Sequence, residues 1–214
     1  MTKHRVRVRF GKRGDLRMIS HRDLVRLWER LLRRAELPLG MSQGFHPKAR
    51  LSFPSALALG IESWDEVLVF ELSRPVETEE IRRRIESQAP AGLTIHEVRL
   101  LEPGHSKGRL RSSTYRIRIP AARRAALQRR IKLLAEQSSY WFQRKAGSGP
   151  PEGFPALDQL DLQHGVLEFR LLVNHQGGIR VREVIDMLGL TDIESQGGCL
   201  IRTAMQIEGS PHNF

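Results

Sequence analysis

Aromatic, basic and amide side chains gather at residues 42–50, in a combination that suits contact with a polynucleotide. Gly44 lets the backbone approach a ligand closely, and Phe45 offers a stacking face. The donors to phosphates or base edges are Gln43, His46, Lys48 and Arg50. The stretch therefore favours contact with single-stranded RNA. A structural alternative remains open, in which Phe45 and Pro47 pack into the core beneath the loop and the charges are solvated.

Just before this loop, five arginines lie along a predicted helix, largely away from its apolar stripe. They are Arg22, Arg26, Arg30, Arg33 and Arg34. Only Glu29 and Glu36 are nearby to pair with them. A solvated helix face is the simplest explanation, but we favour phosphate contacts. A second set of arginines, later in the chain, is expected to grip a nucleic-acid backbone in the same way; it comprises Arg116, Arg118, Arg123 and Arg124.

Signals for catalysis are weak. His21 and Asp23 resemble an acid–base pair, yet Asp23 stands where it would cap a helix and His21 falls in its first turn. The other histidines lack the spacing of metal ligands, so no metal is expected. The sequence has no phosphate-binding loop, no dinucleotide-binding glycine pattern and no nucleophile motif, so no cofactor is expected. We expect no catalytic activity in the chain itself.

Composition also bears on the cellular location and on possible redox chemistry. No window reaches the roughly 18 apolar residues that a membrane helix needs, and the first residues alternate charge rather than form an apolar signal core. Cys199 is the one cysteine, so an internal disulfide and a cysteine-held cluster are excluded. A cytoplasmic protein with no membrane partner is expected.

The net charge of +11 is segregated along the 214 residues. Residues 1–50 carry 14 Lys and Arg against 4 Asp and Glu, whereas residues 51–102 carry 5 against 10. The alternation repeats, with 12 against 1 over residues 103–148 and 4 against 9 over residues 149–214. Two positive surfaces able to attract polyanions are therefore expected.

Apolar spacing places these charges on elements. Residues 4–10 alternate as in a half-buried strand, and Ser20 is an expected N-cap for the arginine-bearing helix. The apolar stripe of that helix is Leu24, Leu27, Trp28, Leu31 and Ala35. The first half of the chain continues with predicted strand segments at 51–53 and 66–72, a helix at 78–88 and a strand at 93–101.

The same order of elements is predicted to begin again after the glycine- and serine-containing residues 103–113. Its strands are expected at 115–119, 140–145, 166–173 and 199–207, and its helices around Leu127 and Val184. Each half fits β-α-β-β-α-β, so the expected fold is α+β with tandem ferredoxin-like halves, an antiparallel sheet with helices on one face in each. The expected domains are 1–102 and 114–214, joined by the linker 103–113.

The first half also carries a family resemblance, strongest from Gly14 to Gly60. The SH-x-D-L opening, the LRRA-x-LP-L helix end and the SQGF-x-P loop resemble the radical-SAM-linked domain of unknown function, which occurs free-standing or fused behind cobalamin-binding radical SAM proteins. That family usually has leucine where this chain has Arg22 and asparagine where it has His46. The resemblance implies a radical SAM enzyme as partner, acting on RNA.

Three functions are consistent with these patterns. The favoured one is an RNA-binding or substrate-presenting module that works with a radical SAM enzyme in tRNA or rRNA modification. The second is a metal-independent endoribonuclease, because tandem ferredoxin-like halves also resemble CRISPR RNA-processing enzymes, with His21 or His46 as general base. The third is a protein-docking subunit that makes no RNA contact.

Overall fold

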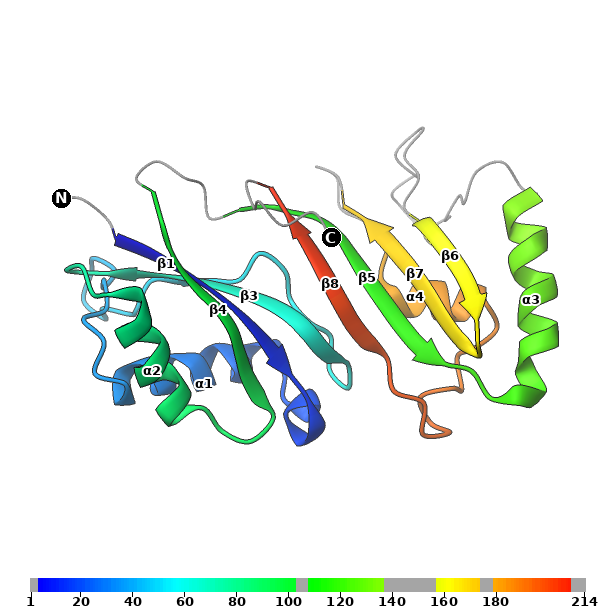
Figure 1. The fold of residues 1–214 in the computed structure, drawn as a ribbon, viewed down its shortest axis with the longest axis horizontal. Helices are drawn as coiled ribbons and strands as arrows, with labels where there is room; N and C mark the ends of the chain where they lie inside the picture. The colour runs from blue at the N-terminus through cyan, green and yellow to red at the C-terminus, as the bar shows by residue number, and fades with distance from the viewer. Residues whose placement is uncertain (1–3, 103–107, 137–156, 174–178, 209–214) are drawn as a thin grey trace. The chain divides into compact units, whose positions relative to one another are not determined.

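A computed structural model describes residues 4–102, 108–136, 157–173 and 179–208. The chain divides into two compact units: unit 1 runs to Arg109 and resumes at Ile207, and unit 2 spans Leu110–Gln206. Both mix helices with antiparallel strands, so the α+β class is confirmed (Figure 1). Within the described residues, no helix is long and apolar enough to cross a membrane.

Unit 1 contains an antiparallel sheet in the order β4-β1-β3, with the short strand β2 paired to the outer side of β3. A 3-10 turn, η1, follows the first strand. The bounds in chain order are β1 His4–Lys12, η1 Gly14–Met18, α1 His21–Arg34, β2 Leu51–Ser52, β3 Glu62–Leu72, α2 Thr78–Gln88 and β4 Leu93–Leu101. The sequence predicts β4 and α2 with these bounds. It starts β3 four residues late, because three of its first four residues, Glu62, Ser63 and Asp65, are polar.

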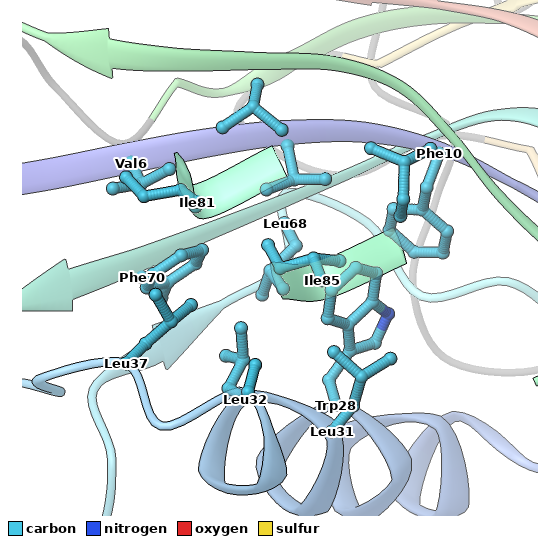
Figure 2. Close-up of a cluster of buried hydrophobic side chains, with 14 of the residues drawn as sticks. Val6, Phe10, Trp28, Leu31, Leu32, Leu37, Leu68, Phe70, Ile81 and Ile85 are labelled. Atoms are coloured by element: carbon cyan, nitrogen blue, oxygen red, sulfur yellow. The ribbon is translucent and has the colours of Figure 1, made fainter. Parts of the chain in front are cut away.

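The core of unit 1 lies between this sheet and the two helices. Figure 2 shows side chains of β1 and β3 meeting those of α1 and α2 in one apolar layer. Trp28 is fully buried in this layer, and its ring meets the ring of Phe10 edge-on, with centroids 4.9 Å apart. Of the stripe predicted for α1, Leu27 is only partly buried, while Leu32 is fully buried in its place.

The start of α1 follows from its N-cap. The Ser20 hydroxyl accepts the backbone N–H of Asp23 at 3.2 Å, which satisfies one of the donors that the first turn leaves without a partner. Its apolar residues Leu24, Trp28, Leu31 and Leu32 are buried against the rest of unit 1. The arginines consequently lie on the opposite side.

Arginines also line the sheet face that points away from the helices of unit 1. Arg9 donates to both carboxylate oxygens of Asp65 at 2.9 Å. Arg7 is 4% exposed, and this burial, together with the neighbouring charge of Arg9, lowers its pKa. On β1, Arg5 and Arg9 are therefore in ion pairs and Arg7 is buried, so α1 presents the more accessible positive charge.

Unit 2 contains a sheet in the order β8-β5-β7-β6. The bounds in chain order are β5 Leu110–Arg118, α3 Ala121–Glu136, β6 Leu157–Gln163, β7 Val166–Leu172, α4 Val181–Met187 and β8 Ile201–Ile207. Its core includes Tyr115 and Phe169, opposite residues on β5 and β7 whose rings stack with centroids 5.7 Å apart. From α3, Leu127 and Ile131 are buried as predicted, whereas Leu134 is half-buried.

Two predictions for this half need correction. The strand predicted at residues 140–145 lies outside the described residues. On the side of β7 away from β5, the pairing strand is β6, which the sequence analysis did not identify. Strand β5 begins at Leu110, inside the predicted linker, because Leu110 and Ser112 are buried. The serine-containing segment read as a linker is thus partly a strand.

Candidate nucleic-acid interface

The loop that the sequence singled out forms an ordered hairpin, residues 40–50, between α1 and β2. The Ser42 N–H donates to the Lys48 carbonyl at 2.8 Å, and the Arg50 N–H donates to the Gly40 carbonyl at 2.9 Å. The Lys48 N–H in turn donates to the Ser42 hydroxyl at 3.0 Å. These bonds bring the two arms together and leave residues 43–47 as the tip.

The base of the hairpin is anchored to the sheet through Glu71 on β3. The Gly40 N–H donates to the Glu71 carbonyl at 2.7 Å, and the Glu71 N–H donates to the Arg50 carbonyl. The Glu71 carboxylate, 7% exposed, also receives Arg50 Nη1 at 3.2 Å and Arg5 Nε at 3.3 Å. Arg50, predicted to contact nucleic acid, therefore holds the hairpin on the sheet, because its guanidinium is engaged by Glu71 and the Met41 carbonyl.

The tip of the hairpin presents Phe45 to solvent with its side chain fully exposed. The structural alternative, in which Phe45 and Pro47 plug the core, is therefore wrong: both are exposed. Gly44 has φ of +126°, a conformation that side chains rarely adopt, so the turn before Phe45 depends on glycine. Gln43, His46 and Lys48 are exposed around the ring.

The five arginines predicted on α1 are all exposed. Arg26 approaches Asp23 at 3.4 Å, and Arg34 donates to the Gln88 carbonyl at 3.2 Å. The remaining three make no ion pair or side-chain hydrogen bond within the described part of the chain; they are Arg22, Arg30 and Arg33. The helix thus carries positive charge that its own surroundings do not balance, which is the condition for attracting phosphates.

The arginines predicted to bind in unit 2 are mostly engaged in structural contacts. Arg116 pairs with Glu168 across the β5–β7 ladder, and Arg124 Nε donates to the Ile119 carbonyl at 3.0 Å. Arg123 Nη1 donates to Asp192 at 2.7 Å, and this bond holds the pKa of the Asp192 carboxyl below its ordinary value. Arg118 is exposed at the end of β5. Two of these four arginines are therefore paired with acidic residues of the same unit, and a third bonds a backbone carbonyl.

The structure does not assemble an acid–base pair from His21 and Asp23. The His21 ring packs edge-on against Phe53, with centroids 5.3 Å apart. The Ser20 hydroxyl donates to Asp23 Oδ2 at 2.7 Å, and this bond, with the charge of Arg26, lowers the pKa of the Asp23 carboxyl and keeps it ionised. His46 is exposed at the hairpin tip, where no described residue bonds to its ring to orient it.

No cluster of three or more His, Cys, Asp or Glu side chains with the geometry of a metal site occurs in the described ranges. Cys199 is half-buried, and its thiol contacts the Leu200 carbonyl at 3.6 Å.

The chain matches one family model, described as "Uncharacterized protein conserved in bacteria (DUF2344)", over residues 5–192. No curated protein matches the chain. Among solved structures, the crystal structure of an unknown protein from Galdieria sulphuraria is similar at 14% identity, over 97% of this chain and 99% of that chain, with a TM-score of 0.29. A TM-score this low does not establish a shared fold.

Proposed function

The chain belongs to this uncharacterized bacterial family, and from that premise we propose that it is a non-catalytic RNA-binding module that presents RNA to a modifying enzyme. The observation that carries the proposal is the exposed arginine face of α1, which spans the helix from Arg22 to Arg34. A polyanion would release counterions as it binds such a face, and that release supplies sequence-independent affinity.

Contrast within the molecule supports this assignment. The arginines of α2 are paired along their own helix, Arg82 with Glu86 at 2.9 Å and Arg84 with Glu80 at 2.6 Å. Helix α1, by comparison, has one such pair, Arg26 with Asp23. A helix that only needed a solvated surface would gain from the pairing seen in α2. We therefore assign the unbalanced charge of α1 to phosphate contact.

The partner in this proposal is a radical SAM enzyme that modifies tRNA or rRNA, as the motif of the first half implies. We further propose that both units are ferredoxin-like. Each has the element order β-α-β-β-α-β, and in each the sheet order is fourth, first, third and second strand. Two such units in one chain can hold an RNA while a separate enzyme performs the chemistry.

The test is filter binding of an unstructured oligoribonucleotide to the full chain over a salt series. We expect binding at low salt that weakens linearly on a logarithmic plot as salt rises. Absence of binding at low salt, or affinity independent of salt, would refute the proposal. Incubating the same RNA with the chain in chelator checks the nuclease alternative, for which we expect no cleavage.

A further inference from the structure

The hairpin of residues 40–50 is held in shape by bonds in its arms and at its base, and none of these bonds involves its tip. Its arms are joined by the Ser42–Lys48 and Gly40–Arg50 backbone bonds, and its base is held by Glu71. The backbone support beneath the ring is therefore in place before a ligand arrives, so binding does not have to order it. The exposure of Phe45 is therefore a property of the built hairpin.

An exposed aromatic side chain at this place has chemistry that suits one kind of ligand. Phe45 is wholly exposed, and around it the hairpin combines the polar and basic side chains of Gln43, His46 and Lys48 with the apolar Pro47 at the tip and Met41 on one arm. A nucleobase offers a flat face to stack on the ring, and the backbone phosphates of the same strand suit Lys48 and His46. The positive charge beside the ring attracts a nucleotide strand, and an apolar protein partner would not gain from it.

Stacking on one ring also discriminates between forms of RNA. In a duplex the bases already stack on one another and their faces are hidden, whereas an unpaired nucleotide can turn its base onto an aromatic side chain. The arginines of α1 contact phosphates, which both forms carry. Selection for unpaired nucleotides would therefore come from the hairpin and not from the helix.

The two features can act on one strand. Gly40, at the base of the hairpin, follows Arg34 by six residues, which places the two within roughly 20 Å even if that segment were fully extended. A strand that runs along the arginines of α1 can thus reach the hairpin.

We propose that Phe45 captures an unstacked base, so that the substrate class of this protein is RNA with unpaired nucleotides, such as a loop or a single-stranded end. This inference rests on the proposed RNA-binding function. It adds a specificity element, Phe45, to the general attraction supplied by α1.

The test compares two substitutions at one exposed position, Phe45→Leu and Phe45→Trp, in the full chain. Leucine keeps an apolar side chain but removes the π-face, whereas tryptophan keeps and enlarges it. Affinity for an unstructured oligoribonucleotide is expected to fall roughly 5- to 150-fold in F45L and to be retained in F45W. The same strand annealed to its complement should bind all three proteins alike, and thermal melting should be unchanged.

A fluorescence measurement supports the binding assay, because stacking on a base quenches the added indole of F45W. Addition of the single strand should quench the emission of F45W more than that of the parent chain, which has 3 tryptophans. The outcomes separate the two proposals. If the parent chain binds no RNA, the proposed function fails; if it binds with the expected salt dependence but F45L binds the single strand equally well, only the capture by Phe45 is overturned. Equal losses for single strand and duplex would also overturn it.

Discussion

The arginine face of α1 leads to a prediction whose size can be worked out. We would replace Arg22, Arg30 and Arg33 with glutamine, since these three side chains are exposed and have no ion-pair partner in the described part of the chain. Glutamine is a good helix former, and the loss of charge at Arg22 and at Arg33 acts on the helix dipole in opposite directions. The variant should therefore fold like the parent chain.

Each phosphate contact to a single strand contributes about 0.7 to the slope of log affinity against log salt. Three lost contacts should lower that slope by about 2. Between about 50 and 200 mM salt, a fourfold change, the affinity gap between parent and variant should consequently narrow by roughly 20-fold. Filter binding or fluorescence anisotropy with an unstructured oligoribonucleotide measures both slopes.

The matched control replaces Arg82, Arg83 and Arg84 of α2 with glutamine. It makes the same change in net charge on the same unit, but it removes arginines that are paired with Glu80 and Glu86. We expect a clearly smaller change in slope for the control. If both triple variants lower the slope equally, bulk charge explains the binding and the assignment of α1 as the phosphate-contacting surface is refuted.

Three further predictions concern stability. Ser20→Ala removes the N-cap of α1 and should lower the free energy of unfolding by about 1 kcal/mol in urea denaturation, and an unchanged midpoint would contradict the cap. Trp28→Ala should cost about 3–5 kcal/mol, whereas Leu133→Ala, at an exposed side chain, should stay within about 0.5 kcal/mol; similar losses would argue against the packing described here. Arg123→Gln should destabilise the chain near neutral pH but not in strong acid. The pKa of the Asp192 carboxyl is lowered in the folded chain, so the ion pair stabilises the fold above the ordinary carboxyl pKa. That stabilisation is lost as pH falls through the pKa that Asp192 has in the folded chain. Chemical denaturation at several acidic pH values measures the difference in unfolding free energy between R123Q and the parent chain. A difference that does not change with pH would contradict the ion pair.

Much of unit 1 was predictable because its signals are local. Alternation over β1, the serine cap of α1 and the apolar spacing of α2 each act within a few neighbouring residues, so a single stretch of sequence contains the information. Strand β6 was missed because it carries two aspartates and two glutamines and only Leu157 is buried, so the sequence has no clear apolar alternation. The signal that could have found it is the pair His164–Gly165, both with positive φ, which forms the tight turn into β7.

The sequence by itself determined the residue types of the candidate interface: five arginines on one helix and an aromatic, basic loop after it. Only the tertiary structure decided which of them are available. Arg50 and Arg123 carry the same charge as Arg30, yet partners distant in sequence, Glu71 and Asp192, engage the first two. Exposure of Phe45 was equally undecidable from the sequence, because core packing and stacking both call for an aromatic ring. The hairpin resolved it by joining residues 40–50 to β3 and directing the tip into solvent.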